Sequence, residues 1–323
     1  MNSPALPVDP DIDHVDHVDH VDHVDHVDHV DHVEQTLPAL FDRDLSFTEA
    51  IVNRSDDGPL VRRFVGSFSE NWFIDRGLHG GHVIAAMTKA VEAGVQDASR
   101  SVRTLTNHYL LPAKAGVFHI DVTIERSGRT LTNASARLVQ EGKTVALALA
   151  ALSGPWDSYE WDHTEMPVVA PPEECPDLWA GSGGRTNLHK NWRYAVAIGP
   201  SMHSGRLFDE ARKETISGGW VRLVEPRPVD AALAAALTDT WVPIPFIYID
   251  ADHPVLFPTV ELTVQFLDPL PLPADTGEDP CLVWHRIDTA RAGFVVQDTE
   301  VWTRSGRLIA RGRQHALLIP ATR

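Results

Sequence analysis

Alternating apolar and polar residues predict a run of strands in the first half of the chain. Residues 118–125 alternate strictly, which is the pattern of a half-buried strand. Similar strands are predicted at 130–140 and 143–153, joined by a turn at 140–142. Residues 80–96, which precede them, leave little polar face, so they predict a buried helix.

The second half of the chain repeats this order of elements. An Ala- and Leu-rich helix is predicted at 229–238, followed by strands near 258–266, 281–287, 295–304 and 307–319. Segment 104–112 parallels 261–269, and segment 141–146 parallels 305–310, so the offset drifts only from 157 to 164. We infer an internal duplication of about 150 residues. Each copy is an α+β unit in which one helix is wrapped by its own antiparallel sheet.

Prolines and glycines separate the two copies. The stretch 155–200 is rich in proline and carries a Gly-Ser-Gly-Gly run, which predicts an extended connection. We therefore expect a tail at 1–40, an N-terminal unit at 41–154, a linker at 155–186 and a C-terminal unit at 187–323.

The tail contains the triplet Asp-His-Val seven times in succession, over residues 13–33. A period of three matches neither a helix nor a strand, so the valines cannot gather on one buried face, and we expect disorder or polyproline II. Alternating imidazoles and carboxylates could chelate Zn²⁺ or Ni²⁺. A solvated tail without a metal role is the favoured interpretation.

Charge and cysteine usage narrow the partners and the compartment. The net charge of -17 argues against nucleic acid and anionic membranes as partners, although ten of the acids lie in residues 1–35. The excess of arginine after residue 284 could serve an anionic ligand. Two cysteines, Cys175 and Cys281, exclude a disulfide scaffold and a four-thiolate metal site. Because no signal peptide or long apolar run is present, we expect a cytoplasmic protein without membrane insertion.

Common catalytic signatures are absent from the sequence. It contains no GxSxG, HExxH or Walker A motif and no strand-linked GxGxxG. Three other segments, 77–86 (GLHGGHVIAA), 125–131 (ERSGRTL) and 305–317, together resemble the acyl-CoA thioesterase II (TesB-type) family. The resemblance covers roughly residues 41–319. It implies a double hotdog fold, hydrolysis of acyl-CoA in fatty acid metabolism, and assembly into homo-oligomers, dimers or tetramers. It implies no metal or cofactor, because coenzyme A is part of the substrate.

The resemblance also implies a catalytic trio that activates water. By motif, the trio is Asp239 after the second helix, Thr259 at the start of the next strand and Gln314 in the last strand. The chain departs from the family at Glu261 and Leu262, where an Asp-His pair is usual. This departure alters the expected pocket wall but leaves the trio intact.

The residues themselves suit these roles to different degrees. Asp239 follows a helix, whose negative end should raise its proton affinity and suit it to act as a base. Gln314 is in register with inward-facing positions, and a buried amide must find partners. Thr259 shares a face with Glu261 by alternation, so an exposed strand threonine fits the pattern as well. A helix-end turn residue and an amide that bonds local backbone are the plain alternatives for Asp239 and Gln314.

Glycines at the start of the first helix could stabilise an oxyanion. Gly80 and Gly81 would present backbone N–H groups at the positive helix end, and we group them with His82 as predicted substrate-binding or oxyanion residues. Close helix–sheet packing explains the glycines equally well. His79 and His82 show no acidic partner in the sequence, so we interpret them as pocket or packing residues rather than bases.

The sequence therefore predicts an acyl-CoA thioesterase. An enoyl-CoA hydratase on the same duplicated fold is an alternative. The pattern that typifies such enzymes, an Asp and a His spaced five apart and followed by a Gly-rich stretch, is not found. A non-catalytic acyl-CoA binding protein is the second alternative.

Overall fold

The computed structural model describes residues 37–50, 60–74, 77–180, 186–199, 215–248 and 255–320. The fold below is that of the unit Pro38–Arg323. The Asp-His-Val repeat lies outside the described residues, so its predicted disorder and metal chemistry stay predictions.

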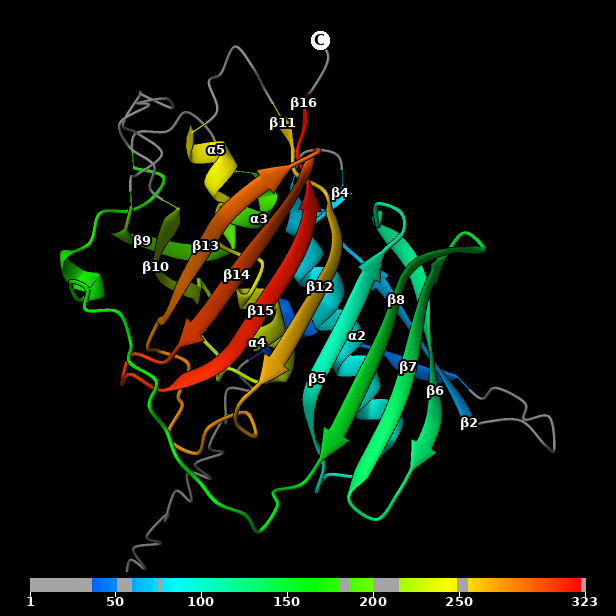
Figure 1. Cartoon of the computed structure of the whole chain (residues 1–323). Helices are drawn as coiled ribbons and strands as arrows, with labels where there is room; N and C mark the ends of the chain where they lie inside the picture. The colour runs from blue at the N-terminus through cyan, green and yellow to red at the C-terminus, as the bar shows by residue number, and fades with distance from the viewer. Residues whose placement is uncertain are drawn as a thin grey trace, which may run out of the picture. The chain divides into compact units, whose positions relative to one another are not determined.

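Twelve of the described strands form one sheet in which all neighbours are antiparallel (Figure 1). The first half supplies β1 Thr48–Ala50, β2 Leu60–Phe68, β5 Ser101–Tyr109, β6 Gly116–Ser127, β7 Leu131–Gln140 and β8 Lys143–Ser153. The second half supplies β9 Trp192–Ile198, β10 Ile216–Leu223, β12 Thr259–Phe266, β13 Cys281–Arg291, β14 Phe294–Trp302 and β15 Leu308–Leu317. Two short pairs lie outside this sheet: β3 Phe73–Ile74 with β4 Gly77–Leu78, and β11 Val255–Leu256 with β16 Ile319–Pro320.

The strand order confirms the duplication. It runs β1-β2-β6-β7-β8-β5-β12-β15-β14-β13-β10-β9, so the two halves meet at β5 and β12. Counting outward from that seam, β8 corresponds to β15, β7 to β14, β6 to β13 and β2 to β10. Two equivalent units side by side are the predicted double hotdog, an α+β fold.

Two buried helices lie against one face of this sheet (Figure 1). Helix α2, Gly80–Val95, packs on β5 to β8 because it has almost no polar side, and it also contacts α4, Ala231–Leu237. Every residue of α4 is buried, and the Asp230 carboxylate caps its start by accepting from the Leu233 N–H at 2.8 Å. Among the described residues, no helix is both long enough and apolar enough to cross a membrane.

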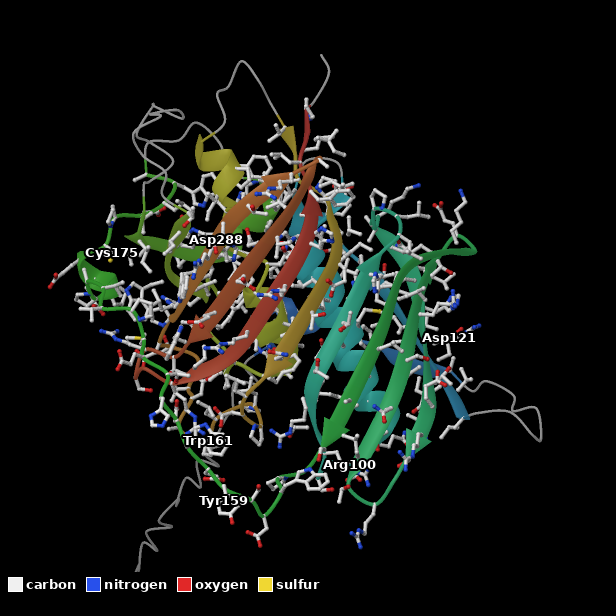
Figure 2. All side chains as sticks on the ribbon, viewed as in Figure 1. Arg100, Asp121, Tyr159, Trp161, Cys175 and Asp288 are labelled. Carbon is white, nitrogen blue, oxygen red and sulfur yellow. The ribbon has the colours of Figure 1, made fainter. Side chains whose placement is uncertain are left out.

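The remaining helices are short. They are α1 Leu40–Asp44, α3 Asn187–Lys190, α5 Ile244–Tyr248, and the 3₁₀ turns Glu70–Trp72 and Pro172–Glu174. The connection after β8 carries the exposed aromatic side chains Tyr159 and Trp161 (Figure 2). Within the proline-rich stretch 155–200, Trp192–Ile198 is the edge strand β9 rather than extended connection. The predicted domain boundaries stay predictions.

Candidate active site

The structure brings the three predicted catalytic side chains together, although the sequence separates them. Asp239 follows the C-terminal end of α4, Thr259 begins β12, and Gln314 lies on the inner face of β15. The Gln314 Nε2 donates to Asp239 Oδ1 at 3.2 Å and also to Thr259 Oγ1. One amide therefore links the carboxylate and the hydroxyl. The catalytic roles of the three residues stay predictions.

A bulge in β12 places Thr259 at this site. Thr259 pairs with Ala316 whereas Glu261 pairs with His315, so a step of two residues along β12 corresponds to a step of one residue along β15. Such a bulge re-aims a side chain. The expectation that Thr259 faces the same way as Glu261 was wrong, because simple alternation is interrupted between them.

Asp239 is a buried carboxyl group with a raised pKa. Its side chain is 11% exposed, and burial raises its pKa to about 7. Hydrogen bonds from the Gly81 backbone N–H and from Gln314 lower the pKa and offset part of that increase. The direction agrees with the expected increase in proton affinity. The main cause is desolvation rather than the helix end.

His79 contacts Asp239 from the other half of the chain. Its Nε2 lies 2.8 Å from the Asp239 backbone oxygen and 3.4 Å from Oδ2. Because a carbonyl oxygen only accepts, Nε2 carries the proton. Burial lowers the pKa of His79 to about 4, so the ring is neutral near pH 7. The interpretation that His79 lacks an acidic partner was wrong, because that partner lies 160 residues further along the chain.

The glycines that begin α2 allow the two helices to approach each other. A Cβ on Gly80 would lie 2.7 Å from Asp239 Oδ2, and one on Gly81 would lie 2.8 Å from the Ala236 backbone oxygen. The Tyr109 hydroxyl on β5 donates to the Gly80 carbonyl at 2.9 Å. Burial, followed by the nearby Asp239, raises the pKa of Tyr109 well above its usual value. Close packing therefore accounts for both glycines, and their oxyanion role stays a prediction.

His82 lies within an aromatic cluster. Its ring stacks on Trp72 with centroids 4.7 Å apart and meets Phe41 edge-on at 5.6 Å. Its backbone N–H donates to the His79 carbonyl at 3.1 Å. Burial holds the pKa of His82 well below its usual value. These are the contacts of a packing residue, which was one of the two interpretations; its role as a substrate contact stays a prediction.

Gln297 is a site residue that the sequence analysis missed. It lies on β14 opposite Gln314, and its Nε2 donates to Gln314 Oε1 at 3.0 Å. The available signal was its place in the strand predicted near 295–304, on the same face as Val295 and Thr299. That strand is the neighbour of β15, which carries Gln314.

The C-terminal arginines are largely engaged with acids. Five of them form ion pairs: Arg286–Asp288, Arg304–Glu173, Arg307–Asp268, Arg311–Glu300 and Arg313–Asp298. In the part of the chain that the structure describes, no cluster of three or more His, Cys, Asp or Glu side chains could hold a metal ion.

Both halves of the chain match models of one protein family. Residues 68–153 match the acyl-CoA thioesterase N-terminal domain, and residues 172–318 match the acyl-CoA thioesterase C-terminal domain. Uncharacterised proteins of Mycobacterium tuberculosis and Mycobacterium bovis are 30% identical over 117 residues. That match spans 34% of this chain and about 40% of the length of these curated relatives.

Solved structures share the fold over most of the chain. A conserved hot dog protein of unknown function from Alicyclobacillus acidocaldarius is 25% identical, with a TM-score of 0.74, over 88% of this chain and 100% of that one. An acyl-CoA thioesterase II from Mycobacterium marinum is 17% identical, with a TM-score of 0.65, over 87% and 99%. The dehydratase domain of PpsC from Mycobacterium tuberculosis, in complex with C12:1-CoA, is 13% identical, with a TM-score of 0.51, over 86% and 99%.

Proposed function

Because this chain belongs to the acyl-CoA thioesterase family of TesB type, matching it in both halves, we propose that it hydrolyses acyl-CoA to a free acid and CoA. The observation that carries the proposal is the Gln314 amide, which bonds both Asp239 and Thr259. This arrangement can hold one water molecule between a base and two polar groups. The proposal requires no metal or redox cofactor.

Asp239 serves as the base in the proposed reaction. With a pKa of about 7, its carboxylate is present at neutral pH and is still basic enough to take a proton. The water oxygen attacks the thioester carbonyl carbon while its proton moves to Asp239. Collapse of the tetrahedral intermediate breaks the C–S bond, and the departing CoA sulfur takes the proton back.

Thr259 and the start of α2 stabilise the charge that develops. Because Thr259 Oγ1 accepts from Gln314, its own proton is free for the water or the carbonyl oxygen. The Gly81 N–H bonds the Asp239 carboxylate in the free protein. We place the oxyanion beside the Gly80 and Gly81 amides, because protonation of Asp239 weakens its hold on that N–H.

Release of CoA thiol tests the proposal. A panel of short, long, branched and aromatic acyl-CoAs is assayed with a thiol reagent, using the wild type and the Asp239→Asn and Gln314→Ala variants. We expect both variants to lose thiol release, whereas Gln265→Ala, which removes an exposed amide on β12, retains it. Unchanged turnover in Asp239→Asn would exclude this mechanism.

Hydration of an enoyl-CoA is the second candidate. The contact between His79 and Asp239 favours it, because addition of water across a double bond needs one group to activate water and another to protonate carbon. Crotonyl-CoA separates the two reactions. Loss of enoyl absorbance without free thiol indicates hydration, and tight binding of acyl-CoA with neither change indicates a binding protein. A cytoplasmic location and homo-oligomeric assembly stay predictions.

A further inference from the structure

Gln297 is a buried amide directly behind the proposed site. Its side chain lies on the inner face of β14 and is only 1% exposed. Its Nε2 donates to Gln314 Oε1 at 3.0 Å, while its own Oε1 has no hydrogen-bond partner among the described residues. A buried amide oxygen without a partner destabilises the folded chain. The position therefore carries a cost that its packing does not explain.

The orientation of the Gln314 amide depends on this contact. Both N–H groups of Gln314 are used, one on Asp239 Oδ1 and one on Thr259 Oγ1. A carboxylate only accepts, so a rotation that turned Oε1 toward Asp239 would set two acceptors against each other. With Nε2 facing the carboxylate, Oε1 must face away, and there it receives the N–H of Gln297. Consecutive hydrogen bonds, such as those from Gln297 to Gln314 and from Gln314 to Asp239, strengthen one another.

The first repeat shows that the fold does not require this amide pair. The sequence match between 141–146 and 305–310 aligns Gln314 with Ala150. Ala150 pairs with Ala134 across β8 and β7, just as Gln314 pairs with Gln297 across β15 and β14. Both alanines are buried. The same place in the sheet thus holds two alanines in one repeat and two amides in the other, and only the second repeat has the trio.

We propose that Gln297 is a positioning residue, which fixes the Gln314 amide so that Gln314 can hold Asp239 and Thr259. This inference rests on the proposed function for its consequence in catalysis. Its structural content, the control of Asp239 through Gln314, is independent of which reaction the site performs.

The first experiment measures Asp239 directly. The carboxyl resonance of ¹³C-aspartate-labelled full-length protein is titrated with pH, and the Asp239→Asn variant identifies the signal. In Gln297→Met, which keeps the side-chain length but loses the donor, we expect the pKa of Asp239 to rise, because the Gln314 N–H is no longer held against the carboxylate. Thiol release should fall about tenfold or more, with little change in KM.

Thr299→Val is the matched control. Thr299 is the next inward position on β14, is equally buried, and its Oγ1 has no hydrogen-bond partner among the described residues. A purely structural effect of removing a buried polar group from β14 should occur in both variants. We expect Thr299→Val to keep the wild-type titration and rate.

A double-mutant cycle provides the second test. Gln297→Ala combined with Gln314→Ala recreates the alanine pair of the first repeat. If Gln297 acts only through Gln314, adding Gln297→Ala to Gln314→Ala causes no further loss of activity and no further shift of the Asp239 titration. An additional loss equal to that of Gln297→Ala alone would contradict the proposal.

The outcomes separate this inference from the proposed function. An unchanged Asp239 titration in folded Gln297→Met overturns the positioning role, whatever the reaction. If the wild type releases no thiol from any acyl-CoA but the titration shifts in Gln297→Met and the double variant shows no further shift, the proposed function fails and the positioning role stands.

Discussion

Desolvation of a single carboxyl group, that of Asp239, raises its pKa into the neutral range. Asp239 must be ionised to act as a base, and its pKa is about 7. We therefore expect kcat/KM to rise about tenfold per pH unit below pH 7 and to level off above it. Asp239→Asn should lower kcat/KM by about 100- to 10,000-fold. A pH profile of thiol release measures both effects; a flat profile between pH 5 and pH 7 would contradict this assignment.

The same raised pKa gives a stability prediction. Between about pH 4 and pH 7 the native chain holds a proton on Asp239 that the unfolded chain releases, so the unfolding free energy falls as pH rises through that window. Asp239→Asn removes the loss of stability that comes from ionising a buried carboxyl group. We expect the variant to be more stable than the wild type at pH 8, by at most about 4 kcal/mol, and to match it near pH 4. Denaturant unfolding at the two pH values measures the difference, and equal differences at both would contradict it.

Sequence reasoning reached some residues of the site and not others. The resemblance to a family supplied Asp239, Thr259 and Gln314, and the structure brings them into contact. His79 was not assigned because its partner Asp239 lies 160 residues away, and local pattern carries no information about such a contact. Gln297 was not assigned because alternation shows that it faces inward but does not show that it lies opposite Gln314. The contact between the two helices brings His79 to the site, and strand pairing in the sheet brings Gln297 to it.

At the scale of elements, glycine at position 80 leaves room for the Asp239 carboxylate beside the start of α2. A Cβ there would lie 2.7 Å from Asp239 Oδ2 and 3.5 Å from the Tyr109 ring. We expect Gly80→Ala to displace the carboxylate and lower kcat by about tenfold or more, because small misplacement of a catalytic group is costly. Gly77→Ala is the control, since its Cβ would meet no heavy atom closer than 3.5 Å. Equal rates in the two variants would show that activity does not depend on the space at position 80.

Strands were predictable where side chains alternate and were missed where backbone packing decides. The strands predicted near 258–266, 281–287, 295–304 and 307–319 correspond to β12, β13, β14 and β15. Strand β10 gave no such signal, because Gly218 and Gly219 interrupt its pattern. A Cβ on Gly218 would lie 2.4 Å from the Trp284 side chain, and one on Gly219 would lie 2.0 Å from the Ala195 backbone oxygen. Glycine is present there because neighbouring strands and side chains approach closely.

At the scale of the whole Pro38–Arg323 unit, the two repeats depend on each other. Strands β5 and β12 pair along the seam, where the Thr106 and Thr263 hydroxyls lie 2.9 Å apart. One cluster of buried apolar side chains includes residues from both repeats, among them Leu105 and Leu262. The candidate site likewise takes His79 from the first repeat and Asp239 from the second. The second repeat holds the whole trio, and the first repeat supplies the His79 side chain that contacts it.

A shared core predicts that the two repeats unfold together. Leu105 is fully buried in that core, whereas Leu149, on the neighbouring strand β8, is 65% exposed. Leu105→Ala should destabilise the protein by about 2 to 5 kcal/mol and shift one single calorimetric transition, because a cavity in the first repeat also weakens the packing of the second. Leu149→Ala should change the free energy of unfolding by no more than about 0.5 kcal/mol. Two separate transitions, of which Leu105→Ala moves only one, would mean that the repeats are stable independently, and the seam would then join two domains rather than complete a single one.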